Sequence, residues 1–243
     1  MCLWSLWYRW VQPFQAACSR NRTFFYLVLV LVGFSIRPEC AGVTSFIRAA
    51  VLEPGLYKGF LHFFNYSTSL DLSYLTRTWG RWVHRRFPVL QVGGYDVYVA
   101  DGLKVAKEGK KMPGVKKLHQ ASENNSKASY IMGHSFQALA LLVGTAGGTV
   151  AAIPLVSRIQ EGLVWFPGDH RSLLDKLAAM FLETVSPMSR RALLVADAYY
   201  ASGKVIRPLL QEDHHWLTRV RKNAVAYQEA PPPKVARRRR PKQ

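Results

Sequence analysis

The stretch Tyr95-Asp-Val-Tyr-Val-Ala-Asp101 alternates between core-type and polar side chains, and it predicts a β-strand that breaks at Gly102. A second stretch, Ala192-Leu-Leu-Val-Ala-Asp197, is apolar up to its last residue and predicts another strand. Both stretches end in Val-Ala-Asp. If the two strands are neighbours in one sheet, both carboxylates project from the same edge, and the small alanines leave room beside them.

The segments around these two strands complete an α/β pattern. Two apolar stretches, His134–Val143 and Thr149–Ile159, flank a glycine-rich turn and predict a hairpin. An amphipathic helix over Asp169–Val185, a helix capped by Ser202, and a strand over His215–Val220 complete the pattern. The predicted element order is therefore β-β-β-α-β-α-β.

The chain divides into three regions by composition. Residues 1–90 have helical periodicity and form an N-terminal α-helical region, residues 91–228 hold the α/β pattern, and residues 229–243 form a basic tail rich in proline and arginine. The run Phe24–Ile36 is apolar over thirteen residues, short of the ~20 needed to span a bilayer, and we expect a buried helix there. The basic residues before this run leave an export signal as the alternative.

The charge of the chain restricts its partners. With 243 residues and a net charge of +18, it carries a large basic excess, and only part of this excess lies in the tail. Such an excess indicates a polyanionic partner, nucleic acid before a membrane surface. A hydrophobic content of 49% excludes wholesale disorder, and a mean hydropathy of −0.03 excludes a polytopic membrane protein.

Basic residues gather at three places that could contact phosphate. One is a stripe on a predicted helix over Asp71–Arg86, another is the lysine-rich connection after Asp101, and the third follows the last predicted strand. A solvated helix face is the alternative for the arginine stripe. The candidate DNA-contacting residues are Arg77, Arg81, Arg85, Lys104, Lys107, Lys110, Lys111, Lys116, Lys117, Arg219 and Arg221.

The two strand-end aspartates are the candidates for chemistry. Like charges placed close together repel, and they are tolerated mainly when a divalent cation lies between them. Carboxylate oxygens suit Mg²⁺ or Mn²⁺, and a pair of such ions can activate an oxygen nucleophile on a phosphodiester. The alternative is structural, because an aspartate at a strand end commonly caps the next helix, and Asp197 lies just before one.

Two segments carry a resemblance to a known family. Asp101-Gly-Leu-Lys-Val-Ala-Lys-Glu-Gly-Lys-Lys-Met-Pro-Gly-Val-Lys-Lys117, with Tyr130-Ile-Met-Gly-His134, resembles the segment around the first aspartate of insertion-sequence transposases of the DDE type. Leu194-Val-Ala-Asp-Ala-Tyr-Tyr200 resembles the segment around their second aspartate. The predicted strand order is similar to the RNase H-like fold of these enzymes, a mixed sheet flanked by helices.

This resemblance implies an activity and a site. Asp101 and Asp197 would be the catalytic, metal-binding aspartates of a two-ion Mg²⁺ or Mn²⁺ site that cuts a DNA strand and joins it to target DNA. The family also uses a third carboxylate on a later helix, and Glu212, Asp213 and Glu229 are all poorly placed for it. We therefore expect an incomplete domain that lacks the last helix, from a truncated copy that is weakly active or inactive. A non-catalytic DNA-binding remnant is the alternative.

The resemblance also implies partners and a compartment. We expect DNA as the partner, both as transposon ends and as target. A homodimer is compatible with the resemblance, and we expect no stable membrane partner. The three cysteines form no C-x-x-C pair, which fits a reducing compartment. We expect a bacterial cytoplasmic protein associated with the nucleoid.

Overall fold

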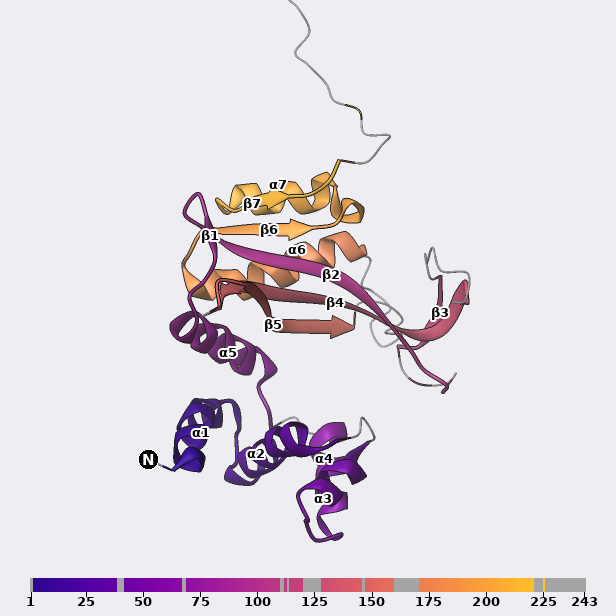
Figure 1. Ribbon diagram of the computed structural model, residues 1–243. Coiled ribbons are helices and arrows are strands. Elements are labelled where there is room, and N and C mark those ends of the chain that lie inside the picture. The colour runs from indigo at the N-terminus through magenta and orange to yellow at the C-terminus, as the bar shows by residue number, and fades with distance from the viewer. Residues whose placement is uncertain are drawn as a thin grey trace, which may run out of the picture.

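The computed structural model describes residues 2–38, 42–66, 69–109, 112, 114–119, 128–145, 147–159, 171–220 and 225. A helical N-terminal region precedes a seven-stranded sheet (Figure 1). The N-terminal elements are α1 (Leu3–Val11), η1 (Gln12–Ala17), α2 (Asn21–Ile36), α3 (Val43–Ala49), α4 (Leu56–Tyr66) and α5 (Leu72–Arg86). The elements that follow are β1 (Gln91–Val92), β2 (Tyr95–Ala106), β3 (Lys116–His119), β4 (Tyr130–Gly144), β5 (Val150–Ile159), α6 (Leu173–Val185), η2 (Ser186–Met188), β6 (Ala192–Ala196), η3 (Ala198–Tyr200), α7 (Gly203–Gln211) and β7 (His215–Leu217).

The N-terminal helices share an aromatic core. Helix α2 contains the apolar run predicted to be a buried helix, and it buries Phe24, Leu27 and Val30 against Phe46 of α3 and Phe60 of α4. Helix α5 connects this core to the sheet, because its first half packs on the N-terminal cluster and its last turns pack on the sheet cluster. None of the helices in the described ranges is both long and apolar enough to cross a bilayer.

The sheet has the strand order that the resemblance predicted. Across the sheet the strands follow β5-β4-β2-β6-β7, with β2, β4 and β5 antiparallel and with β6 and β7 parallel to β2. Strand β3 pairs with the edge of β4 that faces away from β2, and β5 pairs with the same edge further along. At Gly133 of β4, the partner on one side is Ala106 of β2 and the partner on the other side is Lys116 of β3. With its helices, this is the β-β-β-α-β-α-β arrangement of the RNase H-like fold.

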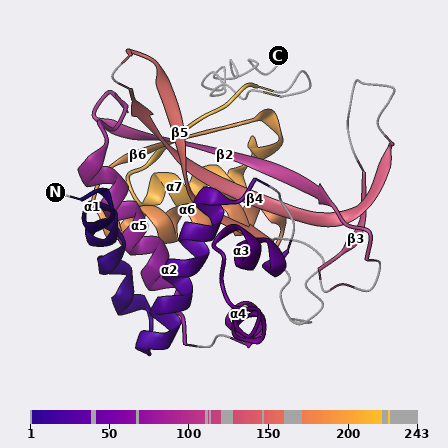
Figure 2. The same cartoon turned by 60° about the horizontal axis from the view of Figure 1, so that its bottom comes forward.

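The helices of the α/β region cover one face of the sheet. The ring of Tyr98 in β2 packs edge-on against Phe181 of α6 and lies beside His84 of α5, so both helices lie over the same face. Helix α7 packs beside α6 and buries Val205 and Leu209 in the same core. Figure 2 shows α5, α6 and α7 gathered beneath the strands.

Helix α6 begins at Leu173, four residues later than the sequence predicted. Its N-terminus is fixed by a capping box, in which Ser172 and Asp175 satisfy each other's backbone N–H groups. Asp169 lies outside the described residues. The prediction was therefore right about the helix and wrong about where it starts.

The predicted break at Gly102 is wrong, because β2 continues to Ala106. Gly102 pairs with Gln137 in the antiparallel ladder with β4, and this ladder continues to Gly133. The far ends of β2 and β4 extend beyond the sheet and carry β3 (Figure 1). We call this extension the β-arm: residues Gly102–Ala106 of β2, all of β3, and Tyr130–Ser135 of β4.

A buried carboxylate anchors the opposite end of β2. Asp96 is fully buried, and its Oδ2 lies 2.6 Å from Nε of Arg190, while its Oδ1 accepts hydrogen bonds from Gln91 (2.7 Å) and from Arg190 (3.1 Å). Nε2 of His84 lies 3.6 Å from the same carboxylate and bonds the hydroxyl of Tyr98 at 3.1 Å. This anchor joins α5, β2 and the segment before β6.

Candidate active site

The main-chain register brings Asp101 and Asp197 to the same rim. Strands β2 and β6 are parallel neighbours, and Ala100 is the Cα partner of Ala196. Each aspartate is the next residue along its chain, and neighbouring strands lie about 4.8 Å apart. The juxtaposition expected from the two Val-Ala-Asp sequences is therefore present in the fold.

Both carboxylates are exposed and held by backbone N–H groups. Oδ1 of Asp101 accepts a hydrogen bond from the N–H of Gly102 at 2.7 Å. Oδ1 of Asp197 accepts one from the N–H of Tyr199 at 3.0 Å and caps η3, so the capping role considered for this residue is real. Within the described part of the chain, the second oxygen of each carboxylate has no hydrogen-bond partner. Each carboxylate is oriented by one oxygen and keeps the other available.

The two aspartates line a cavity of about 550 Å³, which we call the aspartate cavity. One wall comes from Asp197, η3 and the start of α6, and the other comes from the β-arm and the adjoining residues of β2 and β4. Three of the lysines predicted to contact DNA lie on the β-arm wall. The lining residues are Asp101, Gly102, Lys104, Lys116, Lys117, Leu118, His119, Ser135, Phe136, Gln137, Leu173, Asp197, Tyr199 and Tyr200.

The β-arm holds its lysines in a defined arrangement. Nζ of Lys104 in β2 donates a hydrogen bond to the carbonyl of His119 in β3 at 2.6 Å. Nζ of Lys117 lies 4.6 Å from the ring centroid of Tyr130, a cation–π distance. Because the strand extends past Gly102, these lysines lie on a sheet and not in the loop that the sequence predicted.

The remaining basic candidates lie apart from the aspartate cavity or outside the described residues. Arg77, Arg81 and Arg85 are exposed on α5 and form the predicted stripe, but they do not line the cavity. Lys107 follows β2 and does not line the cavity either. Arg219 lies two residues beyond Leu217, where β7 has ended, and it does not line the cavity. Lys110, Lys111 and Arg221 lie outside the described residues.

Gln137, which the sequence did not single out, and Tyr200, which ends the second segment of the resemblance, form the floor of the cavity. Tyr200 is 3% exposed and Gln137 is 2% exposed. Nε2 of Gln137 donates to the carbonyl of Leu173 at 2.9 Å and lies 3.5 Å from the hydroxyl of Tyr200. Burial raises the pKa of Tyr200, as do the nearby charges of Asp101 and Asp197, against the lowering effect of the Gln137 hydrogen bond. The Tyr200 hydroxyl therefore keeps its proton at neutral pH.

A third carboxylate does not join the pair in the described ranges. Asp213 pairs with Arg191 at 2.8 Å, at the opposite end of β6 from Asp197, and Glu212 lies beside it. Hydrogen bonds from Ser172 lower the pKa of Asp175, which serves the capping box. Among the described residues, no three His, Cys, Asp or Glu side chains are placed to hold one metal ion. Glu229 lies outside these residues.

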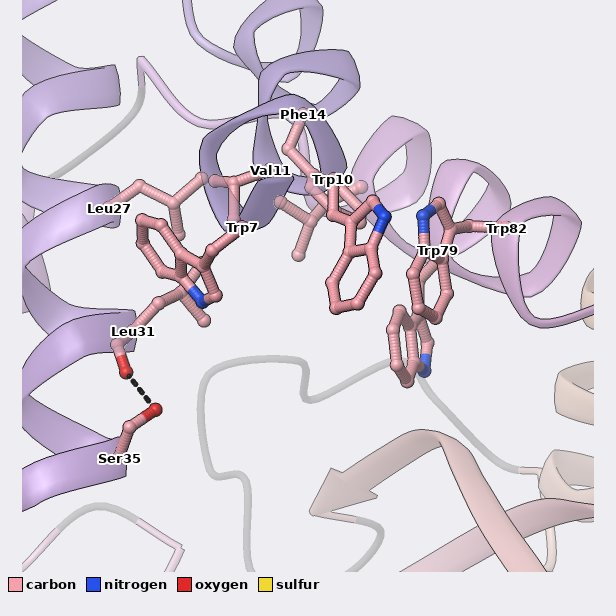
Figure 3. Close-up of a pocket in the computed structure, with 10 residues that line it drawn as sticks. Trp7, Trp10, Val11, Phe14, Leu27, Leu31, Ser35, Trp79 and Trp82 are labelled. Carbon is pink, nitrogen blue, oxygen red and sulfur yellow. Dashed lines mark hydrogen bonds between the residues drawn. The ribbon is translucent and has the colours of Figure 1, made fainter. Parts of the chain in front are cut away.

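A second cavity, of about 350 Å³, lies between α1, η1, α2 and α5 (Figure 3). Its walls include Trp7, Trp10, Trp79 and Trp82, and the last two rings stack with their centroids 5.4 Å apart. The single polar side chain on its walls, Ser35, donates to the carbonyl of Leu31. This apolar cavity offers no acid or base, so we assign the candidate active site to the aspartate cavity.

The match to one family model agrees with this assignment for the second aspartate. Residues 169–243, which include Asp197, match the family model described as a transposase DDE domain. A solved piggyBac transposase synaptic complex with hairpin DNA is similar at 12% identity and a TM-score of 0.36, over 84% of this chain and 42% of that one. The chain thus spans less than half the length of that relative, and no curated protein matches it. The family match spans the second of the two aspartate segments that resemble DDE-type transposases, and it agrees with that resemblance over residues 169–243.

Proposed function

We propose that this chain acts on DNA as a DDE-type transposase, with Asp101 and Asp197 as its catalytic aspartates. The observation that carries the proposal is the pairing of Ala100 with Ala196, which brings two available carboxylate oxygens to one cavity. A structural role for both residues would not require them to be neighbours in the sheet.

The residues of the rim suit a divalent cation. Two exposed carboxylates on adjacent strands repel each other, and each keeps one oxygen free of hydrogen bonds from the described residues. Hard oxygen donors of this kind prefer Mg²⁺ or Mn²⁺. A bound ion would neutralise this repulsion and, as a Lewis acid, would polarise a phosphodiester. Asp101 and Asp197 would hold it.

The β-arm supports DNA as the substrate. Lys104, Lys116 and Lys117 line the same cavity as the aspartates. Lysines at such a wall attract the phosphates of a nucleic acid backbone and position it beside the carboxylates. The net charge of +18 adds a long-range attraction to DNA.

A second candidate function is DNA binding without turnover. The observation that favours it is the carboxylate count, because the described residues bring two acids to the rim and not three. Ligands of one metal site act as a unit, so a site with a ligand missing loses most of its activity. The proposed transposase is therefore weakly active or inactive. A remnant that binds DNA without any turnover is the inactive end of this range.

A nicking assay distinguishes the two functions. Supercoiled plasmid is incubated with the full chain and Mn²⁺, and the relaxed product is compared with that of Asp101→Asn. Asp213→Asn serves as the matched control, since it neutralises an exposed acid at the far end of β6. Nicking that is lost in the first variant and kept in the second supports catalysis. Plasmid binding without nicking by any of the three proteins supports the remnant.

A further inference from the structure

A third cavity, of about 360 Å³, lies in the N-terminal region between the start of α2 and the neighbouring helix α4. We call it the basic pocket, because Arg20, Arg22 and Lys58 line it and none of the described residues on its walls is acidic. It shares no lining residue with the aspartate cavity or with the apolar cavity of Figure 3. The basic pocket is therefore a separate feature of the helical region.

The positive charges of this pocket lack a counter-charge. Arg20, Arg22 and Lys58 are exposed, and none of them forms an ion pair with a residue that the structure describes. Arg20 is the N-cap of α2 but makes no side-chain capping bond, Arg22 lies in the first turn, and that turn has no acidic residue. Positive side chains are unfavourable there, because the helix dipole and the free N–H groups attract anions. A bound anion would offset this repulsion.

A buried tyrosine presents its hydroxyl to the same pocket. Tyr26 is 5% exposed, and its ring is held by an edge contact with Phe60 and by stacking on Phe63. Its hydroxyl lies against Gly59, another lining residue, because a Cβ added to that glycine would overlap the oxygen. The hydroxyl has no hydrogen-bond partner in the described part of the chain, and it is not among the polar atoms sealed from solvent. A ligand in the pocket can therefore reach it.

The groups on the walls are those that bind phosphate. Arginine and lysine side chains, hydroxyl groups and helix N-termini all contact the phosphates of DNA. The hydroxyls of Thr23 and Ser69 lie 2.8 Å apart and join α2 to the segment before α5, which fixes one wall of the pocket. The guanidinium of Arg22 lies 5.8 Å from the ring centroid of Tyr26, so this charge and this hydroxyl belong to one site.

We propose that the basic pocket binds a phosphate group of the DNA backbone. Arg20, Arg22 and Lys58 pair with its charge, and the hydroxyl of Tyr26 donates a hydrogen bond to one of its oxygens. The inference rests on the proposed function, which supplies DNA as the polyanion, and it adds a contact outside the aspartate cavity. Since phosphate contacts position a duplex without reading its sequence, the pocket fixes the place of the DNA on the helical region.

The test measures the binding of a short DNA duplex to the full chain by fluorescence anisotropy over a range of salt concentrations. The double variant Arg22→Gln, Lys58→Gln removes two charges from the pocket. We expect its log–log salt slope to become shallower by about 1, the effect of one lost phosphate contact. Tyr26→Phe removes one hydrogen bond and no charge, so we expect about fivefold weaker binding at an unchanged slope.

Matched controls lie outside the pocket. The double variant Arg48→Gln, Arg207→Gln removes the same charge from exposed positions, and Tyr8→Phe removes an exposed hydroxyl, so both should keep the slope and affinity of the parent. If the pocket variants bind DNA as these controls do, the inference is overturned and the proposed function stands. If they lose affinity for phosphatidylserine vesicles but not for DNA, the pocket binds a lipid headgroup, which also overturns the inference. If the parent binds no DNA, both are refuted.

Discussion

The buried Asp96 anchor gives a stability prediction that two adjacent arginines test against each other. Arg190 pairs with the fully buried carboxylate of Asp96, whereas Arg191 pairs with Asp213 at the surface. We predict that Arg190→Met destabilises the protein far more than Arg191→Met does. The two substitutions are the same, one residue apart, so they differ mainly in the carboxylate that each leaves behind.

The magnitude follows from what is left unpaired. Removing one partner of a buried ion pair costs about 3–5 kcal/mol, because the remaining charge stays in the interior. Arg190 is itself half exposed and Gln91 still bonds Asp96, so we take the low end, about 3 kcal/mol. Arg191 loses an exposed pair and a cation–π contact with Tyr95, together about 1 kcal/mol.

The assay is urea unfolding followed by tryptophan fluorescence at pH 7. A double-mutant cycle with Asp96→Asn adds a check, because Arg190→Met should cost much less once the carboxylate is gone. Equal losses for the two arginine variants would refute the reasoning, as would a cost of Arg190→Met that Asp96→Asn leaves unchanged.

Three other predictions concern pH, salt and packing. Burial lowers the pKa of His214 below its usual value near 6.5, so His214 stays unprotonated in the folded state at a pH where it gains a proton in the unfolded state. The free energy of unfolding should therefore fall as the pH drops through 6.5. Urea unfolding at pH 5.5 and 7.5 measures this slope, which His214→Gln should flatten. DNA affinity should fall steeply with salt, with a log–log slope near −5 for about six neutralised phosphates, measured by fluorescence anisotropy. Gly133→Ala would place a Cβ 2.3 Å from the carbonyl of Val105 and should cost about 1–3 kcal/mol, whereas Gly147→Ala, with open space around it, should be near neutral in the same unfolding assay.

Each of these has an outcome that contradicts it. A pH slope that survives His214→Gln would assign the acid sensitivity to another group. Affinity that does not change with salt would contradict binding through phosphates. Equal stability of the two glycine variants would mean that the β-arm strands shift apart without cost.

The sequence predicted the rim because the rim depends on local pattern and main-chain pairing. Asp101 and Asp197 each follow Val-Ala at the end of an apolar run, and parallel pairing then makes them neighbours. The extent of β2 could not be predicted in the same way. Gly102 is a weak strand former, and it stays in the strand because Gln137 pairs with it across the ladder. That pairing is tertiary information.

The floor of the cavity was missed for a related reason. Nothing in the local sequence distinguishes Gln137 from a solvated glutamine on an exposed strand. Its role depends on the carbonyl of Leu173, which lies 36 residues away along the chain. Tyr200 follows the second aspartate closely, but its place in the sequence does not show that it is buried beside Gln137. The one signal that could have found Gln137 is its alternation with the apolar residues of β4, since it occupies an inward position between Ser135 and Leu139.

The β2–β6 pairing has a practical consequence for biochemistry. Asp101 and Asp197 are neighbours because amide and carbonyl groups of the backbone hold their strands together, and the side chain of neither acid takes part in those bonds. Either acid can therefore be replaced, alone or together, without displacing the other. Functional losses in such variants can be interpreted as lost chemistry and not as a collapsed scaffold, which makes the pair suitable for charge swaps and for cysteine replacement with thiophilic ions.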